Sequence, residues 1–247
     1  MKIFVVKNCI EGLLSALFYS FTENIYPDYV EDKDMFQPRL DALTIDVPTD
    51  NAKNERVKAA LFKYGGDDVI AHLKVCLLSC EKDALSIAFR YAHFMLEERK
   101  DVSERLGNKC VSDFSYTVQR VLHERHIVTG FLRFKESARG VMYAEYAPDN
   151  DITALLAPHF LRRLGAIPFI IHDGKRGKVA ISNGRAIKIC ETNLPTDFSP
   201  SEVEAEMNVL WRRYFQEINI KERKNTRQQD GFFPRRYRKY CFETWEC

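Results

Sequence analysis

The sequence predicts an α+β protein: a helical N-terminal region packed with a mostly antiparallel sheet, followed by a long C-terminal helix and a basic tail. Three patterns support this fold class. Apolar residues recur at helical spacing through most of residues 1–129. Short apolar runs separated by turn residues fill much of the following segment. Arginines and aromatic residues then alternate near the C-terminus. We therefore divide the chain into regions 1–129 and 130–247, which we expect to form one compact unit.

The N-terminal region is predicted to contain one clear strand and several amphipathic helices. Lys2–Val6 reads KIFVV, a short run with high strand propensity. The acidic, proline-containing segment 26–50 is expected to be irregular, with a strand at 42–45. Asn51 or Asn54 is expected to cap the helix that follows it. The expected helices share an apolar stripe at helical spacing and span residues 10–21, 51–64, 67–80, 83–98 and 112–128.

The C-terminal region is predicted to be built from short strands and two helices. Asn183-Gly184, flanked by alternating apolar residues, is the strongest hairpin signal in the chain. The expected strands, each bounded by turn residues, span 131–134, 141–146, 168–172, 178–181 and 186–189. A helix is expected at 152–164 and a longer one at 200–218. The longer helix carries a predicted core stripe of Val203, Met207, Leu210, Trp211 and Tyr214.

Composition indicates a cytoplasmic globular protein without a membrane segment or cofactor. The chain has 247 residues, 45% hydrophobic and 29% charged, which is ordinary for a globular protein. No apolar run approaches the roughly 18 residues that span a membrane, and Lys7, Asn8 and Glu11 interrupt any signal-peptide core. The seven cysteines, an odd number, are expected to be reduced thiols. Their spacings fit no usual zinc or iron–sulfur site, so we expect no metal.

The segment VLHERHIVTGFLRF, residues 121–134, joins the two regions and contains the first candidate site. At helical spacing, Glu124 and His126 fall on opposite flanks of the apolar stripe, where the pKa of a polar group can be tuned. Arg125 falls in the middle of that stripe. A buried arginine requires a carboxylate or a phosphate, or must reach past the helix end. For His126, a catalytic role and a boundary histidine bonded to a carbonyl both remain open.

Two further histidines are candidates for acid–base chemistry. His159 follows Pro158 inside a predicted helix and lies one turn before Arg163. His172 and Asp173 end a predicted strand, where sites are often assembled, although adjacent strand residues face opposite ways. A helix kink and an Asp-Gly turn are the simpler explanations of these two sequences. The chain has no nucleophile elbow, phosphate loop or dinucleotide-binding glycine motif.

The tail combines cations with aromatic rings, a composition suited to nucleic acid. Arginines bind phosphates and aromatic faces stack on exposed bases. The net charge of the chain is only +2, so a basic tail implies a localised anionic partner. A solvated tail whose aromatic residues dock on the domain is the alternative. The alternating residues are Arg223, Lys224, Arg227, Phe232, Phe233, Arg235, Arg236, Tyr237, Arg238, Lys239 and Tyr240.

The order of several motifs resembles an uncharacterised bacterial family of DNA-metabolism and DNA-repair proteins. The resemblance covers nearly the whole chain and is strongest from Val118 onward. The motifs, in chain order, are Glu124-x-His126, Gly130-Phe131-x-Arg133-Phe134, Pro148-Asp149, Ala157-Pro158-His159-Phe160, Ile171-His172-Asp173, Trp211-x-x-Tyr214-Phe215, Glu222-Arg223-Lys224-Asn225 and Pro234-x-Arg236-Tyr237. The chain departs from the family pattern at Arg125, Thr226, Gln228 and Arg238.

The resemblance implies a role in DNA metabolism or repair beside a radical-SAM protein encoded next to it. It also implies kinship with domains fused to uracil-DNA-glycosylase-like domains. It assigns no catalytic residue. The candidates for catalysis are therefore those named from the residues: Glu124, His126, His159, His172 and Asp173. The residues expected to contact nucleic acid are Arg133, Arg223, Asn225, Arg227, Gln229, Arg235, Arg236, Tyr237 and Arg238.

Three hypotheses of function follow. The first is a DNA-metabolism or DNA-repair protein that binds DNA and works with a radical-SAM partner. The second is a hydrolase or lyase acting on a nucleobase or sugar through a histidine and a carboxylate. The third is a non-catalytic adaptor, whose protein-binding face is formed by Trp211, Tyr214 and the tail aromatic residues.

Overall fold

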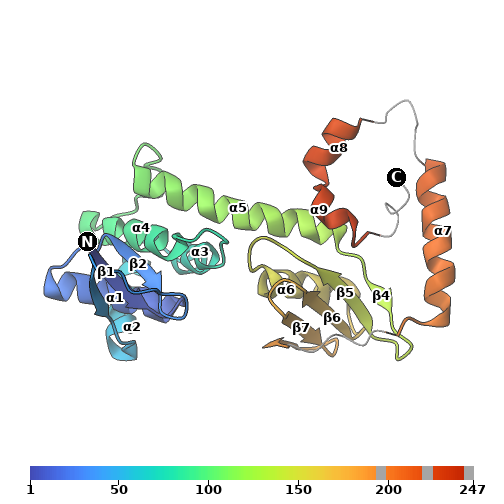
Figure 1. Ribbon diagram of the computed structural model, residues 1–247, viewed down its shortest axis with the longest axis horizontal. Helices are drawn as coiled ribbons and strands as arrows, with labels where there is room; N and C mark the ends of the chain where they lie inside the picture. The colour runs from blue at the N-terminus through green and yellow to red at the C-terminus, as the bar shows by residue number, and fades with distance from the viewer. Residues whose placement is uncertain (193–198, 219–224, 242–247) are drawn as a thin grey trace. The chain divides into compact units, whose positions relative to one another are not determined.

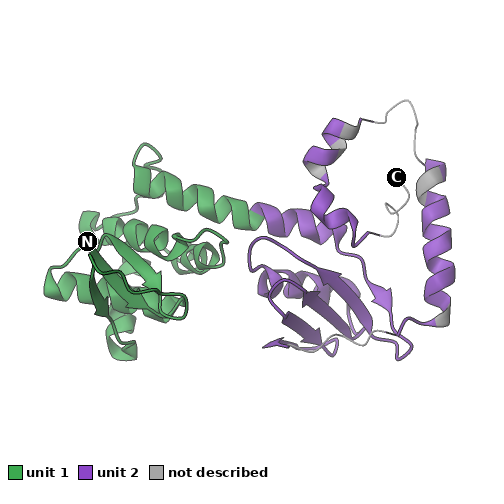
Figure 2. Ribbon diagram, in the orientation of Figure 1, with its two compact units in different colours: residues 1–122 green, residues 123–247 purple. Residues whose placement is uncertain are grey.

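The computed structural model describes residues 1–192, 199–218 and 225–241 (Figure 1). Its helices and two sheets confirm the α+β class. The chain divides into two compact units, Met1–Leu122 and His123–Cys247 (Figure 2). The division falls inside one helix, α5 (Lys109–Phe131), and each unit is described by itself. Among the described residues, no helix is both long and apolar enough to cross a membrane.

Unit 1 contains a parallel three-stranded sheet. β1 (Lys2–Val6) is central, between β2 (Tyr29–Asp32) and β3 (Leu43–Asp46). Both neighbours run parallel to β1. The sequence predicted β1 and the strand near 42–45 but missed β2, because its four residues lie in an acidic segment without clear alternation. Backbone pairing to β1, rather than local propensity, makes this segment a strand.

Helices surround this sheet and bury its central strand. Ile3, Phe4, Val5 and Val6 are all nearly inaccessible to solvent, as expected for the middle of a parallel sheet. The helices of unit 1 are α1 (Ile10–Glu23), α2 (Asn51–Gly65), α3 (Asp68–Leu77), α4 (Ala84–Glu98) and the first part of α5.

The cap of α2 differs from the prediction. Asp50, not Asn51 or Asn54, accepts hydrogen bonds from the backbone N–H groups of Ala52 and Lys53. Asn54 is buried inside the helix, where its amide accepts from the hydroxyl of Ser15 at 2.8 Å. An N-cap residue precedes the first helical turn. Because the helix begins at Asn51, its cap is Asp50, one residue before the first of the two asparagines.

Unit 2 contains a five-stranded sheet in the order β4-β5-β6-β7-β8. Its strands are β4 (Lys135–Glu136), β5 (Met142–Tyr146), β6 (Phe169–Asp173), β7 (Lys178–Ser182) and β8 (Ile187–Glu191). Only β5 and β6 are parallel; the other pairs are antiparallel, as predicted. α6 (Thr153–Leu164) forms the crossover between β5 and β6, which parallel neighbours require.

The predicted strand at 131–134 is wrong. α5 extends to Phe131, and the N–H of Leu132 still bonds to the carbonyl of Val128. The strand that pairs with β5 is β4, where Lys135 lies opposite Tyr143. Short apolar runs fit a helix end and a strand equally well, and the helical hydrogen bonds decide here.

The C-terminal part contains α7 (Glu202–Ile218), α8 (Thr226–Phe232) and α9 (Arg235–Arg238). The core stripe predicted on α7 is wrong for the described residues. Its members are exposed by about half of their surface: Val203 56%, Met207 54%, Leu210 59%, Trp211 42% and Tyr214 53%. Apolar spacing shows that a helix is amphipathic, but it does not show what covers the apolar face.

Candidate functional site

A buried carboxylate, Glu124 on α5, connects three separate segments of unit 2. Its side chain is only 5% exposed. The backbone N–H groups of Asp149 and Asn150 donate to it at 2.9 and 2.8 Å, and the Asn150 amide donates at 2.7 Å. From α9, the Tyr237 hydroxyl donates to the same carboxylate and Arg236 pairs with it at 3.1 Å. We call Glu124, Asp149, Asn150, Arg236 and Tyr237 the Glu124 network.

The Glu124 network keeps its carboxylate ionised. Burial by itself raises the pKa of Glu124, but the hydrogen bonds from Tyr237, Asn150 and Asp149 outweigh that effect, so the net pKa lies below the ordinary value. Burial, and then the hydrogen bond to this carboxylate, raises the pKa of Tyr237. Tyr237 therefore stays protonated and acts as a donor. These properties suit a structural anchor better than a general acid.

The segment 148–150 is held from its other side by a second buried acid, Asp173. This carboxyl is fully buried at the end of β6. It accepts from the backbone N–H of Lys175 at 2.9 Å and pairs with Arg176 at 3.0 Å. The Arg176 guanidinium in turn donates to the carbonyls of Pro148 and Asp149. One acid therefore binds the N–H groups of this segment, and an arginine held by the other binds its carbonyls.

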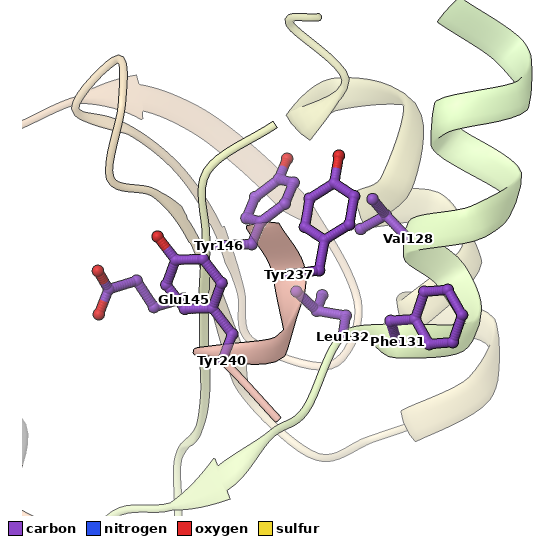
Figure 3. A pocket seen from close by; sticks show the side chains of 7 residues that line it. All are labelled: Val128, Phe131, Leu132, Glu145, Tyr146, Tyr237 and Tyr240. Carbon is purple, nitrogen blue, oxygen red and sulfur yellow. The ribbon is translucent and has the colours of Figure 1, made fainter. Parts of the chain in front are cut away.

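Aromatic contacts complete the attachment of α9. Phe233 stacks on Phe131 with ring centroids 4.2 Å apart, and the thiol of Cys241 contacts the carbonyl of Phe131 at 3.3 Å. Figure 3 shows Tyr237 and Tyr240 beside Tyr146 of β5, around a small cavity. Its volume is about 10 Å³, which is about the space one water needs. A nucleobase does not fit there.

The charges of three arginines of unit 2 act on His159. Arg162 and Arg163 lie in the last turn of α6, and Arg125 lies on α5. Burial lowers the pKa of His159, and the positive charges of Arg163, Arg162 and Arg125 lower it further. All three arginines are exposed. We call them the arginine cluster; among the described residues, none of them makes an ion pair or a hydrogen bond through its side chain.

Residues 82–243 match the model of the family described as a domain of unknown function, DUF4130. The chain belongs to the DUF4130 family. A search of curated proteins gives no match to this chain. The DUF4130 region includes the whole Glu124 network and the arginine cluster, and it takes in only the last part of unit 1.

Motifs that are far apart in the DUF4130 sequence meet in the Glu124 network. Glu124 and Tyr237 are separated by 113 residues, yet their side chains share a hydrogen bond. The Pro148-Asp149 motif supplies one backbone donor to Glu124, the N–H of Asp149, and the next residue, Asn150, supplies another. The residues that carry the family resemblance thus include a buried set that fixes the C-terminal segment on α5.

The angular prediction for α5 is wrong at two positions. Glu124, predicted on a flank, lies on the buried face together with Val121 and Val128, while Arg125 is exposed. These three buried residues are spaced three and four apart, which is one helix face. The predicted stripe was defined from apolar residues alone. Because the buried face also includes the carboxylate of Glu124, the predicted centre of the stripe fell on Arg125 instead of Glu124.

The candidate catalytic histidines of the DUF4130 region are not joined by hydrogen bonds among the described residues. His126 is exposed. The Nε2 atom of His159 is buried without a partner. The Nδ1 atom of His172 is 2.8 Å from the hydroxyl of Tyr143, and Asp173, next to it, points to the opposite face and stabilises the turn after β6. Within the described ranges, no three His, Cys, Asp or Glu side chains group around a metal position.

Several tail cations are paired inside the chain. Arg235 and Arg238 both pair with Asp230, and Arg236 belongs to the Glu124 network. An exposed ion pair contributes only about 0–1 kcal/mol, so a phosphate can replace a carboxylate in such a pair. Contact of these three arginines with nucleic acid remains a prediction.

The other residues predicted to bind nucleic acid differ in their surroundings. Arg227 is exposed on α8, and Asn225 caps that helix by accepting from a backbone N–H at 3.0 Å. Arg133 donates to the carbonyl of Gly130 at 2.9 Å. Arg223 and the side chain of Gln229 lie outside the described residues.

Sequence reasoning missed Asn150, Arg176 and Arg162 as site residues. Asn150 and Arg176 carry no local signal, since both act on a segment or a helix distant in the chain. Arg162 had one, because the two arginines that follow His159 are one helical turn from it. The third member of the arginine cluster, Arg125, was not predicted because helical spacing placed it on the buried face of α5.

Proposed function

We propose that this protein binds nucleic acid through the arginine cluster of unit 2 and acts in DNA metabolism or repair. The observation that carries the proposal is three exposed arginines whose charges all lower the pKa of one histidine, with no ion pair to a carboxylate among the described residues. Arginine binds phosphate through a planar pair of donors. Phosphate contacts supply most of the affinity of nucleic-acid-binding proteins. The DNA context is the one that the family resemblance implies.

A simpler explanation covers only part of the cluster. Cations in the last turn of a helix are stabilised by the helix dipole, which accounts for Arg162 and Arg163. It does not account for Arg125, which lies on another helix. The charge of Arg125 adds to the positive field that Arg162 and Arg163 exert at His159, and an anionic ligand would be attracted by that field.

Binding of labelled single-stranded and duplex DNA, followed by fluorescence anisotropy, tests the proposal. The test variant replaces Arg125, Arg162 and Arg163 together by alanine. We expect its dissociation constant to rise at least about tenfold at about 50 mM salt. The plot of log affinity against log salt should become shallower by roughly 0.9 for each duplex phosphate that the variant no longer neutralises.

A control variant that loses the same number of positive charges distinguishes binding at the arginine cluster from attraction of DNA by the net charge of the protein. Arg139, Lys188 and Arg213 are exposed cations of the same unit that lie on other elements than the cluster, and we expect their joint replacement by alanine to change the affinity less than threefold. Equal losses of affinity in the two variants would show that net charge, rather than the arginine cluster, governs binding. That result would refute the proposal.

The protein partner implied by the resemblance has a different candidate surface. The exposed apolar face of α7 includes Trp211 and Tyr214, whose ring centroids lie 5.4 Å apart. Aromatic residues are enriched in the centre of protein interfaces. We propose that the radical-SAM protein, or another protein if this chain is an adaptor, binds this face. Co-purification of the two proteins, with and without substitution of Trp211, measures the contact.

The proposal does not include catalysis by this chain. A hydrolase or lyase requires an acid or base within hydrogen-bond reach of its partner group or of a shared substrate atom. Among the described residues, the two buried carboxylates are engaged by backbone N–H groups and arginines, and no candidate histidine bonds to either of them.

A further inference from the structure

Unit 1 contains an open cleft that runs along β2 and reaches the carboxyl ends of β1 and β2 at Asn8 and Asp32. Its volume is about 510 Å³, within the range of about 300–1,000 Å³ typical of small-molecule sites. In open parallel sheets, ligands bind outside the carboxyl ends of the strands. The lining residues come from all of β2, the turn after β1, the segment after β2 and the residues around the start of α4; those used below are Tyr29, Asp32, Met35, Phe36, Arg39 and Lys82.

Hydrogen bonds hold the walls of this cleft in place. The carboxylate of Asp32 accepts from the backbone N–H of Asn8 at 3.2 Å, which joins the ends of the two strands. The N–H of Lys33 donates to the carbonyl of Val6 at 2.8 Å. On the other wall, the hydroxyl of Ser86 on α4 bonds to both backbone polar groups of Val30, at 2.8 and 2.9 Å. The cleft is therefore preformed.

The lining offers an apolar surface for a planar ring. Tyr29 is 42% exposed and Met35 80% exposed, and Phe36 lies half-buried beside them. Single exposed apolar side chains are common on a protein surface. Several of them that line the same concave site indicate a ligand-binding surface. Methionine and aromatic side chains are well suited to contact the face of a base.

Among the described residues, two charged groups of the cleft, Asp32 and Lys82, have no ion pair; Asp32 accepts only from backbone N–H groups. Arg39 pairs with Glu31 at 2.9 Å, and Asp83 pairs with Arg90 at 3.6 Å. Lys82 is exposed at the cleft, and among the described residues its ammonium group has no ion pair or hydrogen bond. A ligand that carries both an anionic group and a hydroxyl can engage both residues, because Lys82 can pair with the anion and an oxygen of Asp32 can accept a hydrogen bond from the hydroxyl.

We propose that this cleft binds a mononucleotide. Its base lies against Phe36 and Met35, its ribose hydroxyls donate to Asp32, and its phosphate pairs with Lys82. A carboxylate near the end of the second strand of a parallel sheet is the position that binds ribose in nucleotide-binding βαβ units. This inference goes beyond nucleic-acid binding, because the cleft lies entirely in unit 1.

A dinucleotide is a poorer fit than a mononucleotide. Dinucleotide sites place several glycines between the first strand and its helix, so that a pyrophosphate approaches the backbone. Here that connection, residues 7–9, contains no glycine. The first glycine, Gly12, lies in the first turn of α1, where a Cβ would lie 2.1 Å from the carbonyl oxygen of Lys7. Gly12 is therefore required by the protein's own packing, and the connection between β1 and α1 does not supply the glycines of a pyrophosphate site.

Isothermal titration calorimetry of the full chain with AMP, dAMP, adenosine and inorganic phosphate tests the proposal. We expect saturable binding of AMP, with at least about tenfold weaker binding of phosphate or adenosine alone. Lys82→Ala and Phe36→Ala should each weaken AMP binding about tenfold. Asp32→Asn, which keeps an oxygen to accept from the backbone, should reduce the preference for AMP over dAMP.

Matched control variants in unit 1 make the result specific. Lys74→Ala and Phe62→Ala remove an exposed cation and an exposed ring outside the cleft and should leave AMP binding unchanged. Absence of saturable AMP binding, equal affinity for phosphate alone, or an unchanged affinity of Lys82→Ala would each overturn the proposal. DNA binding by Lys82→Ala should be unchanged, so failure here is separable from failure of the arginine cluster.

Discussion

Replacement of Glu124 by glutamine tests whether the Glu124 network anchors the C-terminal segment. One oxygen of the carboxylate accepts both the backbone N–H and the amide N–H of Asn150, and the other accepts from Asp149 and Tyr237. A glutamine amide presents its own N–H₂ group to one of these pairs of donors, so at least two hydrogen bonds are broken. Each hydrogen bond to a buried charge contributes about 1.5 kcal/mol at the low end of its range. We therefore expect the free energy of unfolding to fall by about 3 kcal/mol.

Arg236 adds little to this figure. Its side chain is 48% exposed, and such an ion pair is screened by solvent. Arg236→Ala should therefore cost less than about 1 kcal/mol. The contrast between these two variants separates the buried hydrogen bonds of the network from its exposed ion pair.

Urea unfolding followed by circular dichroism measures the effect at two pH values. The folded-state pKa of Glu124 lies below its ordinary value of 4.5, so its stabilisation is complete above about pH 4.5 and is lost as the pH falls through the folded-state pKa. The difference between the wild type and Glu124→Gln should be full at pH 7 and shrink under more acidic conditions.

An exposed carboxylate of the same unit provides the control. Glu191→Gln should change the unfolding free energy by no more than about 0.5 kcal/mol. A loss of stability below about 1 kcal/mol for Glu124→Gln, or a loss that does not change with pH, would refute the assignment of this carboxylate as the anchor.

Two further predictions concern a turn and a surface. Gly184 has a φ of 82°, and a Cβ there would lie 2.3 Å from the carbonyl oxygen of Ala166. Gly184→Ala should therefore lower the melting temperature by more than Gly140→Ala, whose φ of 73° imposes only the backbone cost of about 1–2 kcal/mol; equal shifts would contradict the close approach. Trp211→Ala should change stability by less than about 0.5 kcal/mol but reduce co-purification of the partner protein about tenfold, and unchanged co-purification would exclude this face.

The strands of unit 2 were largely predictable because their signals are local. Period-two alternation and turn residues placed the segments of β5 to β8 to within about two residues. The Asn183-Gly184 hairpin lies between β7 and β8, which pair antiparallel, and Gly184 adopts the positive φ that such a turn requires. The physical reason is that the conformation of a tight turn depends on the few residues within it.

β2 and the end of α5 were not predictable from local signals. The four residues of β2 become a strand because β1 supplies their hydrogen bonds. The exposed apolar face of α7 shows the converse case, in which spacing indicates an apolar face but only the tertiary structure shows whether it is covered. A segment whose secondary structure depends on pairing with a distant segment shows only a weak local propensity in its own sequence.

The sequence by itself determined the α+β class, most of the helices and strands, and the identity of the motifs around Glu124. Only the tertiary structure decided what those motifs do. It buried Glu124 and made it the acceptor for Tyr237, 113 residues later in the chain. It exposed Arg125, which helical spacing had placed in the middle of the apolar stripe. Helical spacing gives the angular position of a side chain around the helix axis, whereas its burial depends on which segments pack against that helix.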